Sequence, residues 1–247
     1  QAPLIAQLER ALESNLSGST MAAEVLVRSN SESMSVVVPS ARLRNAEGEG
    51  LLALSQVQVS SDGDDGGQLR IAGNFATDGA GMPRIRGRME NDSAGNPTVR
   101  IDMAPYRTAG SSFAIPQIVL AQSRGGWSFN GEALASGPIP GGTIRDLRLP
   151  IAGEWSDRRG LAMWRRCTDI GFERLELAEL RLGRDNLSLC PDGSGAIVQS
   201  AGSGTQIAAR IEGLELEGRL GDSPIQLASG RIGFNTAEGL VAEQVGV

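Results

Sequence analysis

The sequence contains no histidine and no lysine, because all 23 of its basic residues are arginine. Without histidine there is no Ser-His-Asp or Cys-His nucleophile, no histidine-ligated zinc and no imidazole proton shuttle. Without lysine there is no Schiff-base enzyme and no lysine of a phosphate-binding loop. Few enzyme chemistries other than carboxylate-based ones remain, so the composition favours a protein that binds or builds.

Aromatic residues are scarce as well, at five Phe, three Trp and one Tyr in 247 residues. A carbohydrate-binding module usually needs an aromatic platform, which nine rings scarcely supply. The formal net charge of −6 argues against a surface that follows a nucleic-acid backbone. No apolar run of about 18 residues is present, so no helix that spans a membrane is predicted.

The first segment has the period of an amphipathic helix, which we predict over residues 3–16 within an N-terminal region 1–20. One stripe carries its apolar residues, with charged and amide side chains opposite. Gly18 follows as a stop signal. The polar side is not the basic face that a membrane-surface helix needs, so we expect packing against the rest of the chain. The apolar stripe consists of Leu4, Ile5, Leu8, Ala11, Leu12 and Leu16.

After residue 20 the hydrophobic period changes from 3.6 to 2. The period of 2 continues over residues 21–247 and predicts a mainly β chain of about fifteen short strands. Turn signals such as DGDDGG, NDSAGNP, SGPIPGG and PDGSG separate the runs. The side chains alternate between aliphatic and polar, whereas strands buried on both faces would be continuously apolar. The residues expected on the apolar side are Val99, Ile101, Met103, Trp127, Phe129, Leu147, Leu149, Ile151, Leu175, Leu177, Leu187, Leu189, Leu214 and Leu216.

Such an apolar face must be covered, and the residues alone leave three arrangements open. A second sheet would make a sandwich, closure would make a barrel, and a curved open sheet would hold a non-protein hydrophobe. Few aromatic anchors speak against a sandwich core, and fifteen strands are too many for a small filled barrel. The alternation slips by one residue at Ala178–Glu179, which indicates a bulge or a turn.

The two cysteines, Cys167 and Cys190, lie at the borders of strand-like runs. No metal-ligand spacing accompanies them, so they are either a disulfide or two buried thiols. The segment SSDGDDGG, with Asp62, Asp64 and Asp65, begins like a calcium loop. Gly73 stands where the bidentate glutamate would be needed, so we expect a solvated turn, no metal site and no cofactor.

Other polar clusters have two readings each. Arginines flank GLAMW at 158–159 and 165–166, where they either end a strand in solvent or contact a headgroup or partner. The tryptophans 127, 155 and 164 either cap an apolar face or pack against the helix. Glu173 and Glu176 alternate with arginines and therefore resemble a surface charge ladder more than a catalytic pair. We expect no catalytic residue and no enzyme.

Residues 113–234 contain a combination of strand and turn motifs. They are a strand that ends in the turn GPIPGG, the strand LRLPI, the motif WRRC, two Leu-alternating strands and a second cysteine before Pro191. In this combination the segment resembles the YdbH-like branch of the AsmA-like, TamB-related proteins of the Gram-negative envelope. The resemblance covers about half the chain.

This resemblance implies a U-shaped β-sheet lined with aliphatic side chains, of which residues 21–247 would be one segment within a longer protein. It implies a periplasmic location, an inner-membrane anchor elsewhere in the protein, and phospholipids carried between the inner and outer membranes as partners. An oxidising periplasm would support the disulfide. The alternatives are a β-sandwich and an envelope scaffold with a closed core and no lipid.

Overall fold

The computed structural model describes residues 3–29, 33–62, 69–123, 126–193, 195–202, 204–236 and 239–242. These residues form one α-helix and 19 β-strands, and the registered strand pairs are all antiparallel, as expected for a mainly β protein. The chain divides into two compact units. Unit 1 comprises Gln1–Thr108 and Ala114–Arg124, and unit 2 comprises Ala109–Phe113 and Gly125–Val247.

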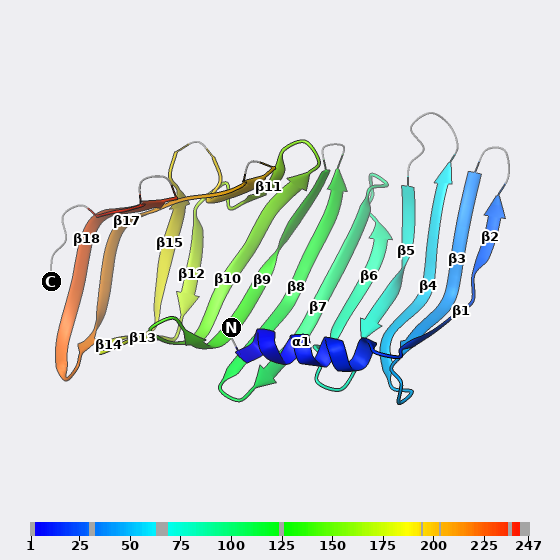
Figure 1. The fold of residues 1–247 in the computed structure, drawn as a ribbon. Helices are drawn as coiled ribbons and strands as arrows, with labels where there is room; N and C mark the ends of the chain where they lie inside the picture. The colour runs from blue at the N-terminus through cyan, green and yellow to red at the C-terminus, as the bar shows by residue number, and fades with distance from the viewer. Residues whose placement is uncertain are drawn as a thin grey trace. The chain divides into compact units, whose positions relative to one another are not determined.

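Unit 1 is a sheet whose strands pair in nearly their chain order, with one helix at their ends (Figure 1). Strands β1 and β2 both pair with β3, each along one half of it. The strand β8 lies mostly in this unit. The elements are α1 (Pro3–Leu16), β1 (Thr20–Ala23), β2 (Leu26–Ser29), β3 (Ser33–Arg44), β4 (Gly50–Asp62), β5 (Leu69–Thr77), β6 (Ile85–Asn91), β7 (Pro97–Thr108) and β8 (Ser111–Ser123).

The helix α1 has the predicted bounds and is held to unit 1 by buried amide side chains. Asn15 Nδ2 donates to the Ala80 carbonyl at 3.0 Å, and Asn45 Nδ2 donates to Asn15 Oδ1 at 3.3 Å. Ala11 is buried, whereas Ile5 and Leu16 of the predicted stripe stay exposed. The side chain of Leu4 lies outside the described residues. The helix is therefore anchored by hydrogen bonds as much as by its apolar stripe.

In unit 2, two long strands enclose three pairs of short ones. Along its length β10 pairs in turn with β13, β12 and β11, and β17 pairs with β14, β15 and β16. The short strands join as β13–β14, β12–β15 and β11–β16. The bounds are β9 (Gly126–Ile139), β10 (Gly142–Ser156), β11 (Gly160–Met163), β12 (Thr168–Phe172), β13 (Arg174–Leu177), β14 (Leu180–Leu182), β15 (Asp185–Pro191), β16 (Val198–Ala201), β17 (Gly204–Leu220), β18 (Ser223–Asn235) and β19 (Gly239–Ala242).

The strands do not follow the apolar runs of the sequence one for one. The apolar residues at 23–28 are divided between β1 and β2, whereas those at 223–234 lie in the single strand β18. The slip at Ala178–Glu179 is a turn that joins β13 to β14, in which Ala178 has a φ of 51°.

Of the described residues, none forms a helix long and apolar enough to cross a membrane.

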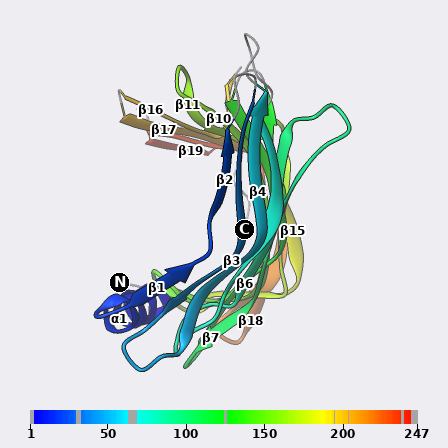
Figure 2. The ribbon, with the colours of Figure 1, turned by 90° about the vertical axis from the view of Figure 1, so that its right-hand side faces the viewer.

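Three long strands contain a step of three residues between successive apolar side chains. The third residue of each step has a positive φ, which breaks the strict alternation of the strand. The register of the neighbouring strands shifts at the first two steps. Figure 2 shows the bend of β3 and β4 in unit 1. The steps are Leu54–Val57 with Gln56 (φ 53°), Ile144–Leu147 with Asp146 (φ 52°), and Ile211–Leu214 with Gly213 (φ 71°).

Polar and glycine neighbours accommodate these steps. Ser136 Oγ accepts a hydrogen bond from the Asp146 backbone N–H at 2.8 Å. Beside the step in β4, Gly73 of β5 has a φ of 143°, and a Cβ there would lie 2.6 Å from the Cα of Val57. Only glycine fits this close approach of two backbones.

An aromatic ring covers a cross-strand glycine in each unit. Phe75 lies opposite Gly87 in unit 1, and Phe129 lies opposite Gly153 in unit 2. A Cβ at either glycine would overlap the ring of that phenylalanine. The ring therefore rests flat against the strand and shields backbone that glycine leaves bare.

A disulfide joins Cys167 to Cys190 in unit 2. It closes the β12–β15 ladder at the Thr168–Leu189 end. The short strands of this region, of three to seven residues, have few ladder hydrogen bonds each, so a covalent link between them limits their separation.

Gly153→Ala should destabilise the protein by about 1–3 kcal/mol, because the added methyl group meets the Phe129 ring and the Ala162 carbonyl. Urea unfolding followed by circular dichroism measures the change. Gly183→Ala is the control, since a Cβ at Gly183 has no neighbour within 4 Å. Equal unfolding midpoints for the two variants would contradict this packing.

Replacement of both cysteines by alanine should lower the free energy of unfolding by about 3.4 kcal/mol, the loop-entropy value for this span. The same urea experiment on oxidised protein measures it. Dithiothreitol should shift the wild-type midpoint in the same direction and leave the double alanine variant unchanged. A dithiothreitol effect of equal size on both proteins would contradict a stabilising disulfide.

Candidate functional site

The strand register of unit 2 collects its apolar side chains on one face of the sheet, here called the unit 2 face. Cross-strand partners share a face, so the ladder can be followed from strand to strand. Leu149 of β10 lies opposite Ala133, and Ile144 lies opposite Leu175 of β13. Beyond them, Leu175 lies opposite Leu182, which lies opposite Gly218 of β17. Eleven of the residues predicted for an apolar side lie on this face: Trp127, Phe129, Leu147, Leu149, Ile151, Leu175, Leu177, Leu187, Leu189, Leu214 and Leu216.

The other three predicted residues, Val99, Ile101 and Met103, lie on the corresponding face of unit 1. In the β6–β7 ladder they are opposite Met89, Gly87 and Ile85. The same face continues across β5, β4 and β3. We call it the unit 1 face, and its further members include Ala41, Leu43, Leu52, Leu54, Val57, Val59, Ile71 and Phe75.

Sequence reasoning missed several members of the unit 2 face. Ile170 and Phe172 of β12, and Ile225 and Leu227 of β18, lie on it by register. Their runs are short or are interrupted by glycine and proline, so the period of 2 was weak there. Ile144 was missed because the three-residue step separates it from Leu147.

Little protein covers these faces. The buried cluster of unit 2 contains Phe172, Leu182 and Leu216, and the neighbouring aliphatic side chains remain only half-buried. Large apolar residues on the faces are strongly exposed, and an extended exposed apolar patch marks an interaction site. In unit 2 these are Trp155 at 44 %, Leu220 at 51 % and Phe234 at 41 %, and in unit 1 they are Met21 at 70 %, Val27 at 60 % and Met34 at 53 %.

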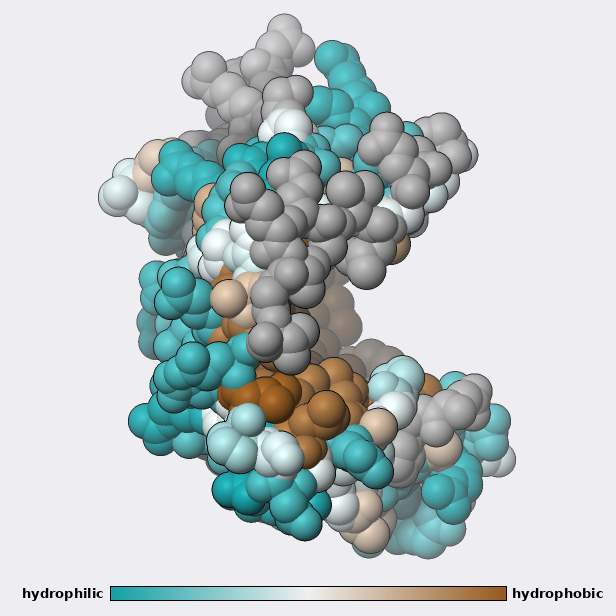
Figure 3. All heavy atoms as spheres, turned by 90° about the vertical axis from the view of Figure 1, so that its left-hand side faces the viewer, coloured by the Kyte–Doolittle hydropathy of each residue, from teal (hydrophilic) through white to brown (hydrophobic). Residues whose placement is uncertain are grey.

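The space-filling view toward the C-terminal strands of unit 2 shows the same distribution (Figure 3). Hydrophobic residues gather in a hollow, and hydrophilic residues cover the outside. Among the described residues of unit 2, no second layer covers the apolar side of the sheet, so this side remains exposed to solvent.

The opposite face of each sheet is charged and largely self-paired. In unit 1, Glu90 forms ion pairs with Arg88 at 3.2 Å and with Arg100 at 3.0 Å. In unit 2, Gln226 Nε2 donates to Glu217 Oε1 at 3.2 Å across the β17–β18 ladder. Exposed pairs of this kind contribute little stability, but they make this face compatible with water.

The carboxylates considered for acid–base chemistry are engaged in such pairs. Arg184 Nε donates to Glu173 Oε2 at 2.9 Å, and Glu176 Oε1 lies 4.0 Å from Arg174 Nη1. No cluster of three or more metal-ligating side chains occurs among residues that the structure describes. Within SSDGDDGG, residues 63–67 lie outside the described part of the chain, and they include Asp64 and Asp65 of the calcium-like pattern.

The one resolved pKa shift in the described part of the chain belongs to a turn. The Asn96 backbone N–H and then its side-chain amide donate to the Asp92 carboxylate, which lowers the pKa of Asp92. Ala94 N–H donates to the same carboxylate at 2.9 Å. This arrangement closes the β6–β7 turn and provides no proton-transfer pair.

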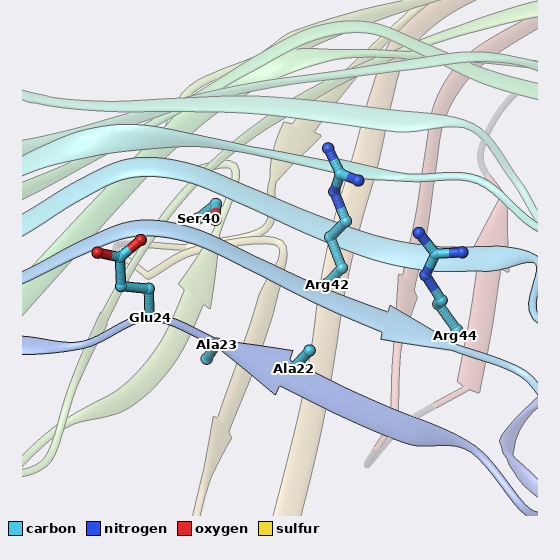
Figure 4. A pocket seen from close by; sticks show the side chains of 6 residues that line it. All are labelled: Ala22, Ala23, Glu24, Ser40, Arg42 and Arg44. Carbon is cyan, nitrogen blue, oxygen red and sulfur yellow. The ribbon is translucent and has the colours of Figure 1, made fainter.

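A cavity of about 480 Å³ lies beside β1 and β3 of unit 1 (Figure 4). Arg42 and Arg44 point to the same side, and Arg44 Nη1 donates to the Gly48 carbonyl at 3.1 Å. The lining combines two arginines with one glutamate and therefore lacks the continuous apolar surface of the unit 1 face. It consists of Ala22, Ala23, Glu24, Ser40, Arg42 and Arg44.

Comparison with known families gives one result that spans the chain. The model of the family described as "YdbH-like: Intermembrane phospholipid transport protein YdbH" matches residues 1–247. Comparison with curated proteins gave no match, and neither did comparison with solved structures.

Proposed function

Because this chain belongs to the YdbH-like family of intermembrane phospholipid transport proteins, we propose that the unit 1 and unit 2 faces hold phospholipid acyl chains during transport. The exposed aliphatic face on a single sheet layer is the observation that supports the proposal. The protein would act as a conduit segment in the periplasm of a Gram-negative bacterium, with an inner-membrane anchor and outer-membrane contacts supplied by other parts of the full-length protein.

The chemistry of the faces suits acyl chains. Each methylene group that leaves water gains about 0.8 kcal/mol, and aliphatic contact requires no fixed hydrogen bonds. A bound chain can shift along a surface of similar Leu, Ile and Val side chains with small changes in free energy. Fixed polar donors along the path would instead hold a headgroup in one place, and the charged side chains of β10 and β17 point to the opposite face.

The three-residue steps extend this surface across the bends. In β10, Ile144 and Leu147 lie opposite Gly137 and Ala135, which are two residues apart on β9 and therefore share a face. In a regular strand, a step of three residues would place Leu147 on the charged side. The positive φ of Asp146 and the register shift keep Leu147 on the apolar side. The step thus lets a bent strand keep one apolar surface for a long ligand.

Leu149→Asp should reduce the phospholipid that copurifies with the protein by about fivefold or more. The reason is that an acyl chain on the unit 2 face would have to remove an ionised carboxylate from water, which costs free energy. The measurement is lipid extraction and mass spectrometry after purification from a Gram-negative host. Arg148→Asp is the matched control, since the adjacent residue points to the charged face.

Circular dichroism and urea unfolding establish that both variants remain folded. A folded wild-type protein that carries no phospholipid would point to a scaffold with a closed core and contradict the conduit. Equal lipid loss in both variants would show that the unit 2 face has no special part in binding.

A further inference from the structure

We propose that the end of the unit 2 face at the β10–β11 turn binds the headgroup of an anionic phospholipid, with Arg158 and Arg159 as contacts to its phosphodiester. The inference rests on the proposed function, because it places the headgroup of a lipid whose acyl chains lie on the same face. The turn joins β10 to the short strand β11 at one end of unit 2 (Figure 1).

The side chains of the unit 2 face change character toward this end. Along β10, Leu147, Leu149 and Ile151 are aliphatic, and Gly153 is covered by Phe129. The last cross-strand pair on the face is Trp127 with Trp155, and Trp155 is 44 % exposed. Tryptophan combines a large apolar ring with one N–H donor, so it favours the boundary between hydrocarbon and a polar headgroup layer.

No such pair stands at the other end of the β9–β10 ladder. There Gly142 lies opposite Ile139, and on the other side Gly142 lies opposite Leu177 of β13. Leu177 in turn pairs with Leu180, which pairs with Leu220. The ladder is therefore aliphatic at this end and aromatic at the β10–β11 turn, so the two ends of the unit 2 face differ in chemistry.

The third tryptophan has a different place. Trp164 Nε1 donates to the Pro150 carbonyl at 2.7 Å, which ties it to the backbone of β10. Trp155 has no comparable hydrogen bond among the residues that the structure describes. Its indole N–H is therefore available to a ligand.

The turn presents two arginines three and four residues after Trp155. Ser156 pairs with Gly160 across the hairpin, and the Arg159 backbone N–H donates to Ser156 Oγ at 3.2 Å. The intervening residues are exposed. These contacts hold the turn backbone, so the two guanidinium groups are presented from a fixed base.

Neither Arg158 nor Arg159 has an ion pair within the described part of the chain, whereas Arg165 nearby binds Glu154. Asp157 is the one acid of the turn, which leaves the turn with a net positive charge. The planar guanidinium fork matches two phosphate oxygens, and two forks beside one acid favour a headgroup with net negative charge. The turn thus complements the anionic end of a lipid as the aliphatic face complements its chains.

The test measures binding of phosphatidylglycerol and phosphatidylcholine, each labelled on one acyl chain with a fluorophore, by fluorescence anisotropy at submicromolar lipid. Wild-type protein should bind labelled phosphatidylglycerol more tightly. Arg158→Gln with Arg159→Gln should weaken phosphatidylglycerol binding about fivefold to tenfold and leave phosphatidylcholine binding within about twofold, because only the anion contacts are lost.

Arg145→Gln with Arg148→Gln is the matched control. It removes the same charge from the same unit, at exposed positions on the opposite face of β10. Its affinity for phosphatidylglycerol should stay near the wild-type value. An equal loss of phosphatidylglycerol affinity in this control would attribute the effect to net charge and overturn the headgroup site. Unchanged phosphatidylglycerol affinity in the Arg158/Arg159 variant would also overturn it.

Two further arms separate other sources of the same effect. The first arm adds inorganic phosphate at about 10 mM, a concentration well above the Kd of a weak anion site. Displacement of the labelled lipid by this phosphate would overturn the proposal in favour of a bare anion site. The second arm compares vesicles with monomeric lipid. If the Arg158/Arg159 variant loses binding to phosphatidylglycerol vesicles but still binds monomeric phosphatidylglycerol, the proposal is overturned in favour of a membrane-surface contact. Wild-type protein that binds neither labelled lipid would instead refute the proposed function itself.

Discussion

The structure depends on the antiparallel hydrogen-bond ladder between neighbouring strands. In the described part of each unit the sheet is a single layer, so the ladder carries the fold that a packed core carries in most domains. Because cross-strand partners share a face, the register within each unit aligns most aliphatic side chains of neighbouring strands on one side. The charged side chains are then aligned on the other side, where they pair with one another.

Long strands in such a sheet have to bend without a change of face. The three-residue steps solve this geometric problem, since an extra residue with positive φ restores the parity of the side chains beyond the bend. Gly73 and the Ser136–Asp146 contact accommodate the steps from the neighbouring strands. Phenylalanine rings cover cross-strand glycines in both units, and the Cys167–Cys190 disulfide links strands that are too short to form many hydrogen bonds.

An exposed apolar face is normally a liability, because it invites association with any hydrophobic surface. In a protein of a phospholipid transport family the same property suits a ligand that has to enter, move and leave. The aliphatic side chains provide many similar contacts, and the tryptophan pair beside two arginines provides a local polar end. The proposed subsite would orient a lipid on a surface that is otherwise uniform along β10.

Sequence alone predicts the helix over residues 3–16, the mainly β class and the side of each strand on which Leu149 or Leu177 lies, because hydrophobic periodicity is a local property of the backbone. It also carried the resemblance to the family. Register and pairing were decided by the tertiary structure: β11–β16 nest between β10 and β17, and Ile144 joins Leu147 on one face across Asp146. These depend on contacts between residues far apart in the chain, which local periodicity does not encode.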